Sequence, residues 1–157
     1  MTLTRADAEV VLVQRAKGKM ALVDMAITTV GTNADLNDPL STAFRLLGYT
    51  PASPVTISDT DLTNLADSKV TEFLDRAELR LLETIHGNID LVDITVGPRR
   101  ESLNQLADQV KDAIDALQKK ISTRYGDIDS ATYPAVGMVR RSYRDAYRVT
   151  DDGSGVA

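Results

Sequence analysis

The middle of the chain carries apolar residues at the spacing of one face of an α-helix. Between positions 58 and 87 they recur at every third or fourth place, as expected for a helix that packs on a core. These residues are Leu62, Leu65, Ala66, Val70, Phe73, Leu74, Ala77, Leu81 and Ile85. Ser58 or Asp59 stands where a helix begins and Gly87 where one ends, so the pattern predicts a long helix between them.

A second stripe, the cleanest in the chain, follows Gly97 and Pro98 and ends at Gly126. Its apolar positions are Leu103, Leu106, Ala107, Val110, Ile114, Leu117 and Ile121. The spacing again fits one helix face, and it predicts a long helix that packs against the first one. Leu106 and Val110 are therefore expected in the core.

Two further helices are predicted closer to the N-terminus. The first runs from about Thr4 to Val30, with Thr4 as its N-cap and an aspartate three residues later. The second is short, with Asp38 as N-cap, Pro39 at the first helical position and Gly48 as its stop. The segment after Gly48 contains two prolines and is expected to be extended.

Between residues 88 and 98 the period changes to two, because Val92, Ile94 and Val96 alternate with Asp93 and Thr95. This alternation predicts a short strand or an extended arm. After Gly126 the helical pattern is lost. Residues 138–149 are predicted to form either a short helix or an extended arm.

The predicted fold class is therefore all-α: a small antiparallel helical bundle with a short extended β-like arm and an extended C-terminal tail. The predicted domain organisation is a helical body over residues 1–126, which includes the arm at 88–98, and a docking tail over 127–157. A body of this size is long enough to bury a single core.

Composition and charge exclude several classes of protein. The chain has no cysteine, so it holds no disulfide framework, thiolate nucleophile or Cys-ligated zinc. Its N-terminal stretch lacks the basic start and apolar run of a signal peptide, and no stretch approaches ~18 uninterrupted apolar residues. We expect a soluble protein without a membrane contact. A net charge of −5 also argues against general affinity for nucleic acid.

No motif for cofactor or metal binding stands out, and we expect no cofactor. Neither a phosphate-binding glycine-rich loop nor a dinucleotide fingerprint occurs. Asp35, Asn37 and Asp38 resemble the start of a calcium loop, but Pro39 and Leu40 occupy positions where that loop needs a ligand-bearing frame and its turn glycine. Turn and N-cap chemistry accounts for the three polar residues.

Candidate catalytic groups are also accounted for structurally. His86 is the only histidine, and beside Gly87 it is expected to stabilise the C-terminus of the helix over 58–87. Carboxylate pairs such as Asp75 with Glu78 and Asp108 with Asp112 are expected on solvated helix faces, and Glu72 and Asp75 have the cation of Arg76 nearby. We therefore predict that the chain is not an enzyme.

Two basic features resist such an explanation. Arg99 and Arg100 stand at the start of the last predicted helix, where the helix dipole disfavours cations. They either form a salt bridge in a solvated first turn or reach a neighbouring subunit or a phosphate.

The second feature is the segment over 138–148, which carries four arginines against one aspartate in an acidic protein. Arginine, tyrosine and methionine are enriched at protein interfaces, so the segment is interpreted as an interface. A disordered basic tail and a helix that covers the domain are the alternatives. The candidate docking residues are Met138, Arg140, Arg141, Tyr143, Arg144, Tyr147 and Arg148.

These segments resemble a known family over about residues 71–126. TEFLDRAELRLLETIHGN, the arm VDITVGPRR, and ESLNQLADQVKDAIDALQKKISTRYG, followed by a tail with Tyr and Arg, are similar to the small head-tail adaptor, or connector, proteins of tailed bacteriophages. The likeness lies in the pattern of residues along these segments and in the predicted architecture, and it includes no catalytic signature.

The resemblance implies a structural subunit of the virion neck, made in the host cytoplasm. Such subunits form rings, here of about twelve copies, below the portal protein, and they extend the DNA channel toward the next neck or tail protein. It implies that the segment over 138–148 docks on the portal or an adjacent copy. The arm would reach between subunits or toward the channel, so Asp93, Thr95, Arg99 and Arg100 are the candidate inter-subunit or channel-facing residues. DNA would pass without sequence-specific binding, because an acidic protein surrounds DNA without gripping its phosphates.

Two other functions stay open from the sequence. A small nucleic-acid-binding or regulatory helical protein would use Arg99, Arg100 and the basic tail on phosphates. An enzyme would require an unrecognised site around His86.

Overall fold

The computed structural model describes residues 3–93 and 100–126 of the 157-residue chain, with side chains described for 3–89 and 105–126. This part is all-α and contains no strand. Its elements, in chain order, are α1 (Arg5–Leu22), the 3-10 turn η1 (Ala34–Leu36), α2 (Asn37–Leu46), α3 (Asp59–Leu62), the 3-10 turn η2 (Asp67–Lys69), α4 (Val70–Asp93) and α5 (Arg100–Tyr125).

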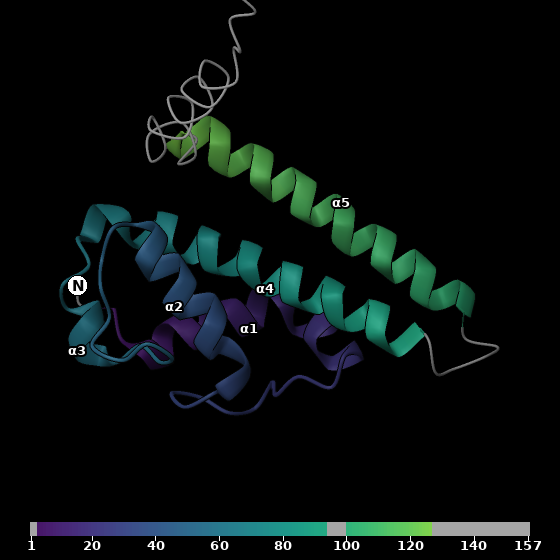
Figure 1. The fold of residues 1–157 in the computed structure, drawn as a ribbon, viewed down its shortest axis with the longest axis horizontal. Coiled ribbons are helices and arrows are strands. Elements are labelled where there is room, and N and C mark those ends of the chain that lie inside the picture. The colour runs from purple at the N-terminus through teal and green to yellow at the C-terminus, as the bar shows by residue number, and fades with distance from the viewer. Residues whose placement is uncertain (1–2, 94–99, 127–157) are drawn as a thin grey trace, which may run out of the picture. The chain divides into compact units, whose positions relative to one another are not determined.

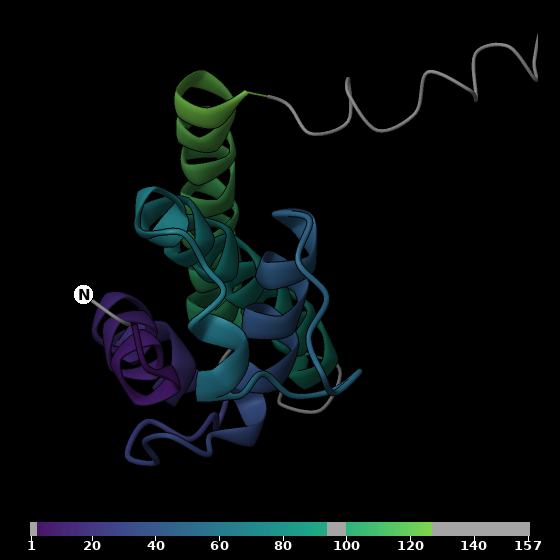
Figure 2. The same cartoon turned by 90° about the vertical axis from the view of Figure 1, so that its left-hand side faces the viewer.

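Helix α4 lies at the centre of the described residues. In Figure 1 it runs through the middle, with α5 along one side and α1 and α2 along the other, and Figure 2 shows the same helices from the side. Its stripe from Phe73 through Leu81 and Ile85 to Ile89 is buried. The α4 surface is therefore covered from several directions, unlike that of an ordinary amphipathic surface helix.

The surrounding helices supply the rest of one aliphatic core. Phe44 of α2 is the aromatic centre, because its ring stacks on Tyr49 at 5.0 Å between centroids and meets Phe73 edge-on at 6.3 Å. Such arrangements are favoured by the ring quadrupoles. The remaining core side chains come mainly from α1 (Ala8, Leu12, Ala16, Met20), from η1 and α2 (Leu36, Leu40, Ala43) and from α5 (Val110, Leu117, Ile121).

Several helix ends are where the sequence predicts them. Thr4 caps α1, and its side chain and that of Asp7 form a capping box. Gly48 and Gly126 follow α2 and α5 with φ of 87° and 82°, a conformation that glycine adopts without strain. The last predicted helix is confirmed as α5.

The first two helices differ from the prediction at their ends. Helix α1 ends at Leu22, eight residues before Val30, and Asp24 takes a positive φ of 59° just after it. Helix α2 begins at Asn37, because the turn η1 leads directly into it. Asp38 is therefore inside the first turn and is not the N-cap, and Pro39 is the third helical residue.

The predicted long helix over 58–87 is two helices. Ser58 caps the short α3 in a capping box with Asp61, and the chain then turns before α4 begins at Val70. Leu62 and Leu65 are buried all the same. Polar residues that favour turns over helix, such as Asn64 and Asp67, lie in the break.

At its other end the prediction stops too early, because α4 continues through Gly87 to Asp93. Ile89 is buried four residues after Ile85, so the helical period outweighs the alternation that predicted an extended arm. The arm prediction is wrong for residues 88–93, and the rest of it, 94–98, lies outside the described residues.

None of the described helices is long and apolar enough to span a membrane.

The core positions on α5 are not equivalent. Val110 is fully buried and Leu106 is half-buried. We expect Val110→Asp to abolish cooperative folding, because an unpaired buried charge costs more than a marginal stability of about 5–15 kcal/mol readily tolerates. Leu106→Asp should leave a folded protein with a lowered melting temperature. Circular dichroism at 222 nm during heating measures both, and equal effects would contradict the observed burial.

Candidate functional site

The sequence-predicted site residues lie at or beyond the edge of the described part of the chain. Asp93 is the last residue of α4 and Arg100 is the first of α5, and only their backbones are described. Thr95 and Arg99 are outside the described residues. So are all seven candidate docking residues, Met138, Arg140, Arg141, Tyr143, Arg144, Tyr147 and Arg148, and these assignments stay predictions.

Within the described residues, polar side chains gather in several clusters, the first around Arg5 at the start of α1. Its Nε donates to Glu9 at 2.8 Å and its Nη1 to the carbonyl of Ile57 at 3.0 Å. Its Nη2 donates to Asn37 Oδ1 at 2.6 Å and to the carbonyl of Asn33 at 3.2 Å. The planar guanidinium thus joins α1 to three segments distant in sequence.

Glu9 is the buried anion of this cluster. It is fully buried and accepts hydrogen bonds from Arg5, from the backbone N–H of Asn33 at 3.2 Å and from that of Gly31. Gly31 has a φ of 85°, so a residue with a side chain is strained there. The carboxylate therefore fastens the loop after α1 to α1 itself.

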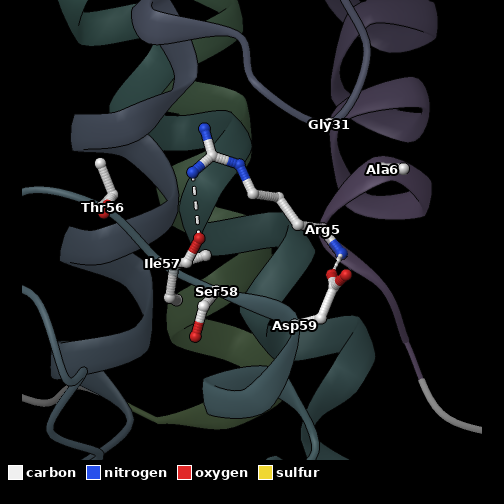
Figure 3. Close-up of a pocket in the computed structure, with 7 residues that line it drawn as sticks. All are labelled: Arg5, Ala6, Gly31, Thr56, Ile57, Ser58 and Asp59. Carbon is white, nitrogen blue, oxygen red and sulfur yellow. Dashed lines mark hydrogen bonds between the residues drawn. The ribbon is translucent and has the colours of Figure 1, made fainter.

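A hollow of about 350 Å³ opens beside this cluster (Figure 3). Arg5, Ala6, Gly31 and residues 56–59 line it. The carboxylate of Asp59 accepts from the backbone N–H of Arg5 at 2.6 Å, and the Ser58 hydroxyl donates to Asp61 at 2.7 Å. These polar groups already serve helix ends and segment junctions, so the geometry indicates a structural role for them.

The second cluster centres on Asp75 of α4, which is fully buried. Arg15 of α1 donates to its Oδ1 at 3.1 Å, and two groups of α5 donate to its Oδ2, Lys120 Nζ at 3.0 Å and the Tyr125 hydroxyl at 3.0 Å. Arg15 also pairs with Glu78 at 2.8 Å. We call Asp75 with Arg15, Lys120 and Tyr125 the Asp75 junction, because it ties three helices together.

The electrostatics of the junction favour the charged carboxylate. Burial alone would raise the pKa of Asp75, but the bonds from Lys120, Tyr125 and Arg15 outweigh it and lower the pKa below its ordinary value. Burial, and then the bond to Asp75, raises the pKa of Tyr125, so the phenol stays a neutral donor. The junction therefore holds a carboxylate whose acceptor oxygens are already engaged.

Glu72 lies one turn earlier on α4 in a similar arrangement. Arg76 donates to it from Nε at 3.0 Å and from Nη2 at 2.8 Å, and Lys69 donates at 2.9 Å. Burial raises the pKa of Glu72, while Lys69 and Arg76 lower it and determine the net direction, which is downward. The expectation that Glu72, Asp75 and Arg76 lie on a solvated face is wrong, because the packing around α4 buries all three.

The other candidates for chemistry take structural positions. His86 lies inside α4, seven residues before its end, so the expected role at a helix C-terminus is wrong. Asp35 accepts from the backbone N–H of Ala26 at 2.7 Å, and Asp38 pairs with Arg80 at 2.8 Å. Among the residues that the structure describes, no group of three or more His, Cys, Asp or Glu could hold a metal ion.

The buried networks around Glu9 and Asp75 were not predicted from the sequence, for different reasons. The spacing of Arg5 and Glu9 by four residues is a local signal that the sequence contains. Asp75 has no such signal, since Arg15 and Tyr125 are 60 and 50 residues away.

Comparisons with models of protein families, with curated proteins and with solved structures find no match for this chain.

The Asp75 junction should contribute measurably to stability. We expect Asp75→Asn to lower the free energy of unfolding by about 1–3 kcal/mol, because bonds to a charged acceptor are weakened, Lys120 loses the carboxylate that it pairs with, and Arg15 keeps only Glu78. Asp115→Asn is the matched control, since Asp115 is exposed on α5. Urea unfolding followed by circular dichroism measures both, and an equal effect of the two variants would refute the role of the junction.

The lowered pKa values predict acid sensitivity. A carboxyl whose pKa is lower in the folded chain stabilises it above the unfolded value, near 4, and the stabilisation is lost as pH falls through the folded value. Glu72 and Asp75 both contribute in this direction. The free energy of unfolding of the wild type should therefore decrease below about pH 4. Its slope should be shallower in Asp75→Asn, and an unchanged slope would show that Asp75 does not titrate as described.

Proposed function

We propose that this chain is a non-enzymatic head-tail adaptor subunit of a tailed phage, present in the neck of the virion as a ring of copies. Its partners would be the portal protein, neighbouring copies and the next neck or tail protein. DNA would pass through the ring without sequence-specific binding, and no membrane is involved. The proposed architecture is an antiparallel helical bundle with a C-terminal docking tail, and an extended arm limited to residues after Asp93.

The uneven charge of the chain is the observation that carries the proposal. Residues 1–126 hold 14 basic and 18 acidic side chains, whereas residues 138–148 hold four arginines and one aspartate. An acidic body repels the phosphates of passing DNA, and a basic segment with tyrosines suits a protein interface. The division therefore fits a subunit that docks through its tail and leaves DNA free to move.

The described contacts support a scaffold in the same sense. Glu9, Glu72 and Asp75 are buried carboxylates, and each accepts from at least two donors within the protein. Asp75 in this way joins α4 to α1 and α5, Glu9 fastens the loop after α1, and Glu72 links the turn η2 to α4. The family resemblance adds a further argument, because it covers most of α4 and all of α5, the two helices that pack on each other.

The docking proposal is tested with the full chain. We expect Arg140→Gln/Arg141→Gln/Arg144→Gln to lose co-sedimentation with the cognate portal ring while circular dichroism stays unchanged. Lys17→Gln/Lys111→Gln/Lys119→Gln removes the same charge from exposed positions on the body and should bind like the wild type. Retained binding by the arginine variant would refute tail docking.

The same proteins separate the adaptor from a nucleic-acid-binding protein. Fluorescence anisotropy with duplex DNA should show little binding by the wild type at about 0.15 M salt. Affinity that falls steeply with added salt and is lost in the arginine variant would instead favour the nucleic-acid-binding function.

A further inference from the structure

The C-terminal end of α5 is attached to the body by few side chains. Leu117 and Ile121 supply the buried apolar contacts there. Lys120 and Tyr125 supply the polar ones, both to Oδ2 of Asp75. Attachment of this end thus depends on the buried Leu117 and Ile121, on the half-buried Tyr125 that packs against the same core, and on two bonds to one carboxylate oxygen.

These polar contacts lie at the edge of the protein. The Lys120 side chain is 48% exposed, Tyr125 is half-buried, and the exposed Arg124 guanidinium lies 5.5 Å from the centre of the Tyr125 ring. Solvent ions therefore reach one side of the junction and screen it, which they cannot do for an enclosed ion pair.

Asp75 keeps a counter-ion when the donors of α5 are removed. Arg15 belongs to α1 and binds Oδ1 at 3.1 Å, independently of the oxygen that α5 uses. Arg15 is itself held by Glu78 at 2.8 Å. Departure of the α5 end would therefore not leave an unpaired buried charge, which is the usual reason why breaking such a pair unfolds a protein.

The neighbouring networks are also independent of α5. Glu72 is bound by Arg76 and Lys69, from α4 and η2, and Glu9 by Arg5 and by backbone N–H groups of the loop after α1. In the described part of the chain, none of the hydrogen bonds to these two carboxylates comes from α5. The hydrogen bonds that join α1 to the loop after it, and those that join η2 to α4, thus persist without the end of α5.

We propose that residues 117–125 form a releasable strap, which detaches from Asp75 while α1, α2 and most of α4 stay folded. The strap immediately precedes the segment that begins after Gly126. If that segment docks as proposed above, the strap is the part of the body that docking would load first. This consequence rests on the proposed function, whereas the strap itself does not.

Hydrogen exchange measured by mass spectrometry on the full chain tests the strap without any partner. We expect Tyr125→Phe and Lys120→Gln each to speed exchange of amides in 117–125 by about three- to tenfold, as loss of one hydrogen bond allows. Exchange in 73–85 and in α1 should stay at the wild-type rate. Lys119→Gln is the matched control, an exposed lysine that should change neither region.

Salt provides a second readout on the wild type. Raising the salt concentration to about 1 M shortens the screening length to about 3 Å and should speed exchange in the strap alone. The proposal is overturned if exchange in α1 and α4 rises by the same factor as in 117–125, because the end then opens only by global unfolding. It is equally overturned if neither variant differs from Lys119→Gln.

Discussion

The charged residues buried in the packing around α4 impose the constraint on which the rest of the structure depends. Glu72, Asp75 and Arg76 are buried beside Phe73 and Ala77, so one stretch of helix is enclosed on its polar side as well as its apolar side. Buried charges are tolerated only when they are paired and hydrogen-bonded. The positions of Lys69, Arg15, Lys120 and Tyr125 follow from that requirement.

This requirement also explains how three helices acquire one register. An apolar stripe allows a helix to slide or rotate by small amounts, because many packings bury similar area. The bonds of Arg15, Lys120 and Tyr125 to a single carboxylate allow far fewer arrangements. The core thus provides most of the burial, while the Asp75 junction selects which faces of α1, α4 and α5 meet.

Sequence patterns predicted what is local and failed where tertiary packing decides. The Thr4 N-cap, the stops at Gly48 and Gly126 and the helix α5 follow from neighbouring residues, and all were predicted. The boundary at Val70 was not predicted, because the apolar stripe continues across the break. The extension through Gly87 was not predicted either, because the glycine was interpreted as a helix stop and the alternation after it as an arm. For the candidate site, the i, i+4 pair of Arg5 and Glu9 was readable in principle. The partners of Asp75 were not, since they come from helices far away in the chain.

The reach of Arg5 along the sequence bears on the order of folding. Its side chain contacts Ile57 and its backbone contacts Asp59, 52 and 54 residues away, whereas α4 and α5 are neighbours in the chain. Closing a long loop costs more chain entropy than pairing adjacent helices, so contacts between distant segments form more slowly. We therefore expect α4 and α5 to pair early, and the N-terminus of α1 to become fixed only when residues 57–59 are already in place. The contacts of Arg5 would then be among the last to form, so their presence would indicate that folding is complete.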